Sequence, residues 1–354
     1  MASRPGILVK FRPAGPWRFG PDDGARDRAE VVGHSDLVFA AVCQAMAQFG
    51  DLPAWLAATA EAPSSAVRFT SLFPFHGRAL FAPPPANLWP PPSQRLRFKG
   101  ARFAPLSLLQ DLAAERPVRE ERWEVDPESA CVIPSGGDAP YRMVTRTAAA
   151  VDRLNGNAQP HRTAGVEFGP GAGLWCWAEF DSTEARERWL PLLKTAFRWL
   201  GDTGFGGERS RGWGRSEGVE FSESDTETLL LGTTAPAASS AYWLLSSFSP
   251  AITDSVDWSR GEYSLATRQG RVETSGTLKR SARVVTEGSV VVAGSLPLGA
   301  AVDVAPAGHP HPVYRAGFAV AVPVPWKEVI DRPLATLTDV VIEPSEPTER
   351  EIPA

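Results

Sequence analysis

The stretch GFGGERSRGWGR, residues 204–215, combines five glycines with three arginines and a tryptophan. Glycine lets the main chain adopt positive φ angles and come close to a ligand, and exposed N–H groups in such a bend form a nest for an anion. Arginine adds bidentate hydrogen bonds to phosphate. We therefore predict that this glycine-rich segment contacts phosphate groups.

Known phosphate-binding motifs fit the segment poorly. No Gly-Lys-Ser/Thr ends it, as a Walker A loop requires, and it follows a helix, whereas the glycines of a dinucleotide fold follow a strand. Arg211 to Gly214 begin like the RNP1 motif of an RNA-recognition domain, but Arg215 stands where an aromatic residue belongs. A tight turn between a helix and a strand is the structural alternative, although a turn needs only one or two glycines.

Apolar periodicity predicts the elements that carry this segment. Residues 7–13 and 173–180 have the pattern of strands. Residues 35–49 have apolar residues at helical spacing, with Ser35 or Asp36 as N-cap and Gly50 as stop. A second helix follows residue 180, with Asp181 and Glu184 in capping-box register. We expect Pro191 either to kink this helix or to mark its true start.

Two further regions are rich in turn residues. Residues 72–103 contain repeated prolines, which predict a long surface excursion without a central strand or helix. Residues 121–173 predict a projecting hairpin or loop. Strand-like runs at 242–250 and 316–325 then repeat the pattern of the first half. The sequence predicts an α+β protein of two ferredoxin-like βαββαβ (RRM-like) domains with long insertions, at residues 1–225 and 226–354.

Composition sets further bounds. The chain has 354 residues and a formal net charge of −5, which disfavours a nucleic-acid partner at first sight. The acidic residues gather at 221–228 and 342–354, however, so a local positive field can survive. Three distant cysteines form no CxxC pair and predict a reducing cytoplasm. No apolar run approaches eighteen residues, so neither export nor a membrane span is expected.

The order of elements and motifs resembles the RAMP proteins, the RNA-binding subunits of CRISPR effector complexes. Their helix followed by a glycine-rich loop is matched by GFGGERS. HSDLVFAAVCQAM at 34–46, VDRLNGNA at 151–158, TSGTLKRSARVVTEGSV at 274–290 and GHPHPVYRAGFAV at 308–320 resemble further motifs of one group. That group is Cas-five-like and comprises the fourth subunit of the type III-A Csm interference complex.

The resemblance implies an RNA-binding protein without catalysis, metal or cofactor. Its partners would be the 5′ handle of the crRNA, a large polymerase-like effector subunit and a neighbouring backbone RAMP subunit. A hairpin thumb, expected at residues 141–165, would wedge between handle and guide. The predicted RNA-binding residues are His34, Ser35, Arg146, Arg153, Gly204, Gly206, Gly207, Arg209, Ser210, Arg211, Trp213, Lys279 and Arg280. A bound single strand would need a cationic groove, main-chain amides and stacking surfaces.

Two alternatives remain open on the sequence alone. Endonucleases that process CRISPR RNA are also RAMP proteins, and His34 is the candidate general acid or base, although it has no lysine or tyrosine at helical spacing. The second alternative is a protein-interaction scaffold, since 12 tryptophans would suit a large interface. Asp36 is expected to cap a helix rather than to cleave RNA. His309 and His311, with prolines between them, predict a rigid turn rather than a metal site.

Overall fold

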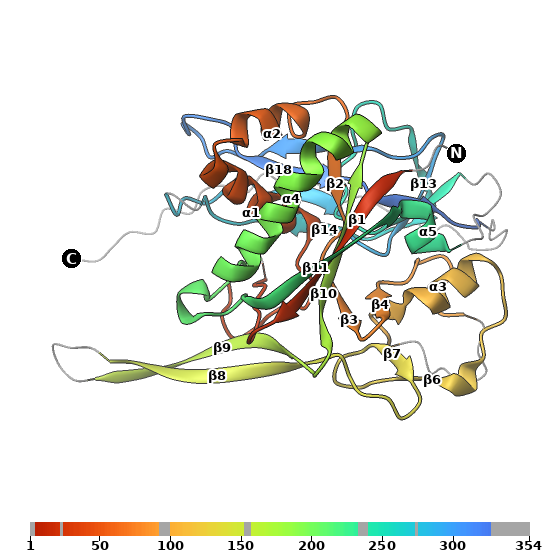
Figure 1. Cartoon of the computed structure of the whole chain (residues 1–354), viewed down its shortest axis with the longest axis horizontal. Helices are drawn as coiled ribbons and strands as arrows, with labels where there is room; N and C mark the ends of the chain where they lie inside the picture. The colour runs from red at the N-terminus through yellow and green to blue at the C-terminus, as the bar shows by residue number, and fades with distance from the viewer. Residues whose placement is uncertain are drawn as a thin grey trace, which may run out of the picture.

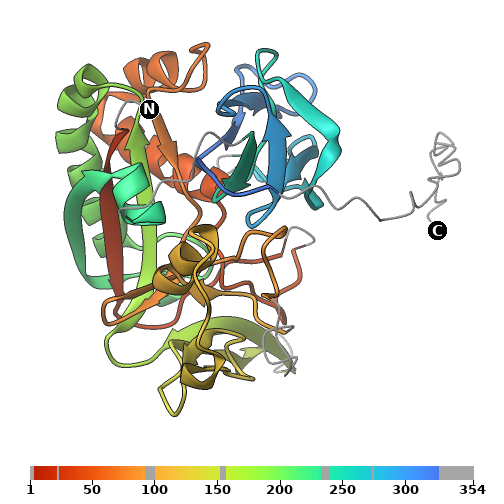
Figure 2. The same cartoon turned by 90° about the vertical axis from the view of Figure 1, so that its right-hand side faces the viewer.

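The computed structural model describes residues 4–21, 24–91, 100–151, 157–232, 240–272 and 275–326. The fold is mixed α/β and rich in strands. A seven-stranded antiparallel sheet runs in the order β11-β1-β10-β3-β4-β5, and β2 also pairs with β10. We call residues 4–232, which contain this sheet, the first unit, and residues 240–326 the second unit. Figure 2 shows the two units side by side.

The centre of the sheet is buried on both faces. Strand β10 (Ala172–Phe180) pairs with β1 (Pro5–Pro13) and is buried along its whole length. Its even-numbered residues, such as Cys176, pack toward α1 and α4, whereas Trp175 and Trp177 enter a second apolar cluster. That cluster also contains Trp243 and Val290 of the second unit. The two units therefore share part of one core.

Three helices cover one face of the sheet: α1 (Ser35–Phe49), α2 (Leu52–Ala58) and α4 (Thr183–Thr203). The predicted helices α1 and α4 are confirmed, and Gly50 ends α1 in a left-handed conformation. Both predicted N-caps are wrong. His34 precedes α1 without a side-chain cap, and the Ser182 side chain caps α4 by accepting a hydrogen bond from the Ala185 N–H.

Helix α4 also settles one of the expectations for Pro191. The helix starts at Thr183 and runs through Pro191, so a start near the proline is wrong.

The expectation of a surface excursion at residues 72–103 is wrong for its described first part. Strands β2 (Val67–Phe69), β3 (Phe73–His76) and β4 (Ala79–Ala82) belong to the main sheet. Phe73, Phe75 and Phe81 are buried. Pro74 lies inside β3, because the apolar phenylalanines around it outweigh the loss of one backbone donor. Residues 92–99 lie outside the described residues.

A small lobe follows the sheet. It begins after β5 (Ala104–Pro105), the last strand in the sheet order, and contains α3 (Leu106–Ala113), a 3₁₀ turn (Glu120–Arg122), β6 (Trp123–Val125) and β7 (Val132–Pro134). The chain then forms a long hairpin of β8 (Tyr141–Val151) and β9 (Ala158–Phe168), which projects from the body in Figure 1. The predicted projecting hairpin is confirmed in shape.

After α4, the glycine-rich segment contains a 3₁₀ turn (Arg209–Arg211) and leads into β11 (Ser216–Asp225) and α5 (Thr226–Leu231). The second unit consists of strands in its described parts. They are β12 (Ala241–Leu244), β13 (Val256–Glu262), β14 (Leu265–Arg268), β15 (Ala282–Val285), β16 (Val290–Ala293), β17 (Gly299–Asp303), β18 (Tyr314–Phe318) and β19 (Ala321–Pro323). Residues 240–272 and 275–326 contain no helix, so the helices of a second βαββαβ domain are not found there.

Candidate nucleic-acid interface

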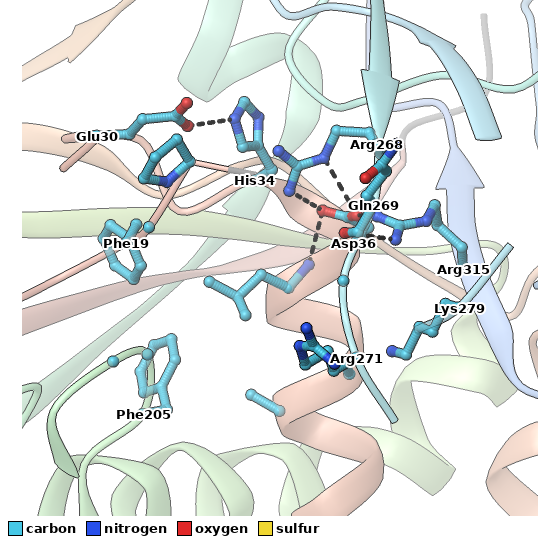
Figure 3. A pocket seen from close by; sticks show the side chains of 18 of the residues that line it. Phe19, Glu30, His34, Asp36, Phe205, Arg268, Gln269, Arg271, Lys279 and Arg315 are labelled. Atoms are coloured by element: carbon cyan, nitrogen blue, oxygen red, sulfur yellow. Dashed lines mark hydrogen bonds and ion pairs between the residues drawn. The ribbon is translucent and has the colours of Figure 1, made fainter. Parts of the chain in front are cut away.

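A cavity of about 660 Å³ lies where three distant parts of the chain meet. Its walls come from residues 18–44 with the start of α1, from the glycine-rich segment, and from residues 268–279 and Arg315 of the second unit. Figure 3 shows Phe19 and Phe205 on one side of the view and Arg271 and Lys279 on the other. Among the predicted RNA-binding residues, the cavity brings together His34, Gly206, Gly207, Arg209 and Lys279.

The glycine-rich segment bends tightly onto the protein itself. Gly204, Gly206, Gly212 and Gly214 all have positive φ angles, between 77° and 90°. A Cβ on Gly206 would lie 2.7 Å from the Arg18 carbonyl oxygen, and the Gly207 N–H donates to that same oxygen at 2.8 Å. Phe205 packs edge-on against Phe11 and Trp17. The segment therefore needs its glycines to pack closely on residues 16–19, of which Arg18 and Phe19 line the cavity.

Positive charge dominates the cavity wall. Besides His34, six arginine and lysine side chains line it, against the carboxylates of Glu30 and Asp36: Arg18, Arg209, Arg268, Arg271, Lys279 and Arg315. The Arg18 side chain is buried, and its Nε has no hydrogen-bond partner among the residues that the structure describes. Burial lowers the pKa of Arg18 from its usual value.

Asp36 holds two of these arginines in place. Its carboxylate accepts hydrogen bonds from Arg268, at 3.2 Å, and from Arg315. Burial opposes ionisation of Asp36, but the charges of Arg268 and Arg315 outweigh it and hold the pKa of this carboxyl below its usual range. The expectation that Asp36 serves as a helix cap is therefore wrong. It forms an ion-pair bridge between the two units.

His34 lies between two carboxylates. Its Nδ1 is 2.9 Å from Glu287 and its Nε2 is 3.0 Å from Glu30. Burial lowers the pKa of the imidazole, but the charge and hydrogen bond of Glu287, with the hydrogen bond of Glu30, raise it to about 10. The imidazole is thus a protonated cation at neutral pH, with a hydrogen bond at each ring nitrogen. This environment disfavours a general acid or base, which works best with a pKa near the working pH.

Ser35 is also an inter-unit residue. Its side chain is buried, its N–H donates to the Ser71 hydroxyl at 2.8 Å, and its own hydroxyl accepts from the Ser247 N–H at 3.0 Å. The predicted direct contact of Ser35 with RNA is therefore wrong in this conformation, because the hydroxyl is enclosed. The His34–Ser35–Asp36 triplet connects the units instead.

The rest of the glycine-rich segment lies beside the cavity. Ser210 and Arg211 are exposed in the 3₁₀ turn, and Arg211 bonds to Glu208 and to His161. Gly204 is buried against the Trp213 carbonyl. The Trp213 ring is 4% exposed, so the predicted stacking surface is wrong for this conformation. The ring packs on the base of the hairpin.

The remaining predicted residues are separated from the cavity. Arg146 lies on β8, paired with Glu167 and 5.5 Å from the Trp213 ring centroid. Arg280 is exposed and pairs with Asp303. Arg153 lies outside the described residues. His309 and His311 have ring centroids 4.5 Å apart, and the described residues contain no cluster of metal-ligating side chains.

Sequence reasoning missed Arg18, Arg268, Arg271 and Glu287. Arg18, Arg268 and Arg271 lie outside the matched motifs. Glu287 lies within the matched run at 274–290, which was the available signal for it. No helix in the described part of the chain is long and apolar enough to cross a membrane.

Comparison with known proteins gives the family context. Residues 237–324 match the family model of the CRISPR Csm4 C-terminal domain. A chain of the Csm3–Csm4 subcomplex of the type III-A CRISPR-Cas interference complex is 16% identical, with a TM-score of 0.63, and the match covers 90% of this chain and 99% of that one. The protein has a Csm4-like fold. A chain of a Csm1–Csm4 cassette in complex with cA4 has a similar fold. It is 19% identical, with a TM-score of 0.56, and the match covers 92% of this chain and 99% of that one.

The Csm4 matches confirm the resemblance to RAMP subunits of type III complexes that the sequence motifs indicated. The Csm4 C-terminal family match includes β12 to β19 and therefore the cavity wall at residues 268–279. A search of curated protein sequences gives no match.

Proposed function

We propose that the chain is the subunit of a type III CRISPR effector complex that holds the 5′ handle of the crRNA. The observation that carries the proposal is the cavity, where the glycine-rich segment, the start of α1 and residues 268–279 meet around six cationic side chains. Single-stranded RNA is bound by cationic grooves with aromatic surfaces, and Phe19 and Phe205 border this one. Contacts from the other predicted residues, including Arg146, Arg153, Arg211 and Arg280, would extend the path.

The partners follow from the matched assemblies. Csm4 chains of similar fold occur with Csm1 in one solved structure and with Csm3 in another. We infer that this chain docks a large Csm1-type subunit and a Csm3-type backbone subunit. Co-purification of the tagged chain with each partner from its own locus tests this. Failure to retain either partner would contradict it.

The fold supports this role in two further ways. The strand order β11-β1-β10-β3, with α1 and α4 on one face, favours a ferredoxin-like arrangement for the first unit. Cys43, Cys131 and Cys176 are free thiols, which supports a reducing cytoplasm as the place of action.

Binding across salt concentration tests the RNA site. Purified protein and a handle-bearing RNA should lose affinity by about 0.7 log units per log unit of salt for each phosphate contact. Arg209→Ala with Arg211→Ala should weaken binding and flatten this slope while the protein stays folded. Arg116→Ala, at an exposed pair with Asp111 outside the cavity, is the matched control. An equal affinity of the double variant and wild type would contradict the proposal.

The absence of catalysis is part of the proposal. The carboxylates beside His34 hold it protonated, so it cannot accept a proton from a ribose hydroxyl near neutral pH. Incubation with a repeat RNA should leave the RNA intact. Cleavage that disappears in His34→Ala would favour the processing endonuclease instead, and salt-insensitive or absent RNA binding would favour the interaction scaffold.

A further inference from the structure

The glycine-rich segment and the β8–β9 hairpin are packed together through Trp213. Gly165 of β9 faces the indole, and a Cβ at this position would lie 2.6 Å from Cζ3 of Trp213 and 3.1 Å from the Trp17 carbonyl oxygen. The guanidinium of Arg146, on β8, lies 5.5 Å from the ring centroid. The indole is 4% exposed, so this contact encloses it almost completely. Gly165 is therefore required for the close approach.

Polar contacts hold the same junction. Glu208, at the turn of the glycine-rich segment, pairs with Arg26 and with Arg211. The Arg26 carbonyl accepts a hydrogen bond from the Ala164 N–H of β9 at 2.8 Å. The Arg211 guanidinium lies 3.2 Å from Nε2 of His161. The segment is thus connected to β9 directly at Gly165 and His161, and through Arg26 at Ala164.

A main-chain bridge completes the attachment. Trp17 and Val166 exchange backbone hydrogen bonds of 2.9 and 2.8 Å. Beyond this bridge, the described residues of β8 and β9 form a sheet of two strands. An 11-residue strand spans about 35 Å, so a turn of about 10° at its base moves its far end by about 6 Å.

We propose that Trp213 is a positioning residue that sets the direction of the β8–β9 hairpin relative to the glycine-rich segment. The inference rests on the proposed RNA-binding function. The segment and the hairpin then contact one RNA at a fixed separation, and the exposed Arg162 of β9 is a cation available to the nucleotides beyond the handle. The tryptophan acts through packing and does not itself stack on a base.

Two RNAs separate this role from RNA binding in general: the handle alone, and the handle extended by guide nucleotides. Wild type should bind the longer RNA about tenfold more tightly, as expected for hairpin contacts to additional nucleotides. Gly165→Ala should keep handle affinity within about twofold and lose most of the gain, because it disturbs the junction from the hairpin side. If Gly165→Ala still binds the extended RNA as much more tightly than the handle alone as wild type does, the inference is overturned.

Controls address folding and specificity. Gly218→Ala on β11 introduces a methyl group with no neighbour within 4 Å and should behave as wild type. Trp213→Leu removes the ring atoms that the alanine would strike, so adding Gly165→Ala to it should cause a smaller loss than Gly165→Ala causes in wild type. Additive losses would overturn the inference. If Gly165→Ala fails to fold, Trp213→Leu alone must lose the length-dependent gain.

A measurement without RNA separates this inference from the proposed function. Amide hydrogen exchange at Ala164 and Val166 should be faster in Trp213→Leu than in wild type, because both N–H groups bond across the junction. Unchanged exchange would overturn the positioning role. Wild-type protein that binds neither RNA would overturn the proposed function while leaving the exchange result intact.

Discussion

The carboxylate of Asp36 and the guanidinium of Arg315 form a buried ion pair, with side chains 6% and 7% exposed. The pair joins the first turn of α1 to β18, 279 residues later in the chain. Arg268 shares the same carboxylate. The wall of the cavity and the link between the two units are therefore one structure.

Asp36→Asn should lower the free energy of unfolding by about 3–5 kcal/mol, because it leaves two buried guanidinium groups without their counter-charge. Urea denaturation at neutral pH measures the loss. Glu220→Gln breaks the exposed pair with Arg12 and should cost at most about 1 kcal/mol. Equal effects of the two substitutions would contradict the structural role of Asp36.

The His34–Glu287 pair predicts a particular dependence of stability on pH. The folded pKa of His34 is raised to about 10 from 6.5, so its stabilisation is complete below 6.5 and is lost as the pH rises through 10. The pKa of Glu287 is lowered from 4.5 to about 2: burial opposes the shift, but the charge and hydrogen bond of His34 outweigh it. Its stabilisation is present above 4.5 and is lost as the pH falls through 2.

His34→Gln isolates this effect, because glutamine can still donate a hydrogen bond but carries no charge. The difference in unfolding free energy between wild type and variant should be greatest between pH 4.5 and 6.5 and should shrink toward pH 10. Denaturant titrations across this range measure it. A difference that grows with rising pH would show that the imidazole is neutral in the folded protein.

Gly212 and Gly214 provide a matched pair in the glycine-rich segment. Both have left-handed φ angles, of 79° and 77°, but a Cβ meets nothing within 4 Å at Gly212 and lies 2.2 Å from the Phe205 carbonyl oxygen at Gly214. Gly212→Ala should cost about 1 kcal/mol from conformational strain alone. Gly214→Ala should cost at least about 2 kcal/mol more and weaken RNA binding. Thermal unfolding and RNA titration compare them, and equal costs would argue against the packed loop.

Arg271 and Lys279 test the second unit as a part of the RNA site. Each contributes a cation to the cavity wall from a strand-free stretch. Arg271→Gln and Lys279→Gln should each reduce the salt dependence of RNA affinity by about 0.7 log units per log unit of salt. Arg116→Gln, outside the cavity, should leave the slope unchanged. Unchanged slopes in both cavity variants would place the RNA elsewhere.

Local patterns predicted the elements that depend on local physics. The structure has α1, α4, β1, β10 and the hairpin within a few residues of their predicted positions. The signals were the helical period of the two helices, the apolar runs of the two strands and the turn residues around the hairpin. Strand β3 was missed because its proline received more weight than the alternating Phe73 and Phe75. That alternation was the available signal for a buried strand.

The roles of individual site residues were harder to predict, because their partners are distant. His34 bonds to Glu287, 253 residues away, and no local pattern pairs them. An exposed cation and a buried bridge have the same sequence signature until the fold is known. Trp213 illustrates the same problem. It was predicted as a stacking surface, but β9 approaches and encloses the ring because Gly165 has no side chain.

The cavity is lined by parts of residues 18–21 and 24–44, by residues 205–209, and by residues 268–271, 278–279 and 314–315. A chain emerging from the ribosome at about 5–20 residues per second needs roughly 15 to 60 s between the synthesis of the first and the last wall. A chain synthesised only as far as residue 215 therefore has the glycine-rich segment without the cations of the second unit. If the proposed function holds, capture of RNA at this cavity has to follow the synthesis of Arg315.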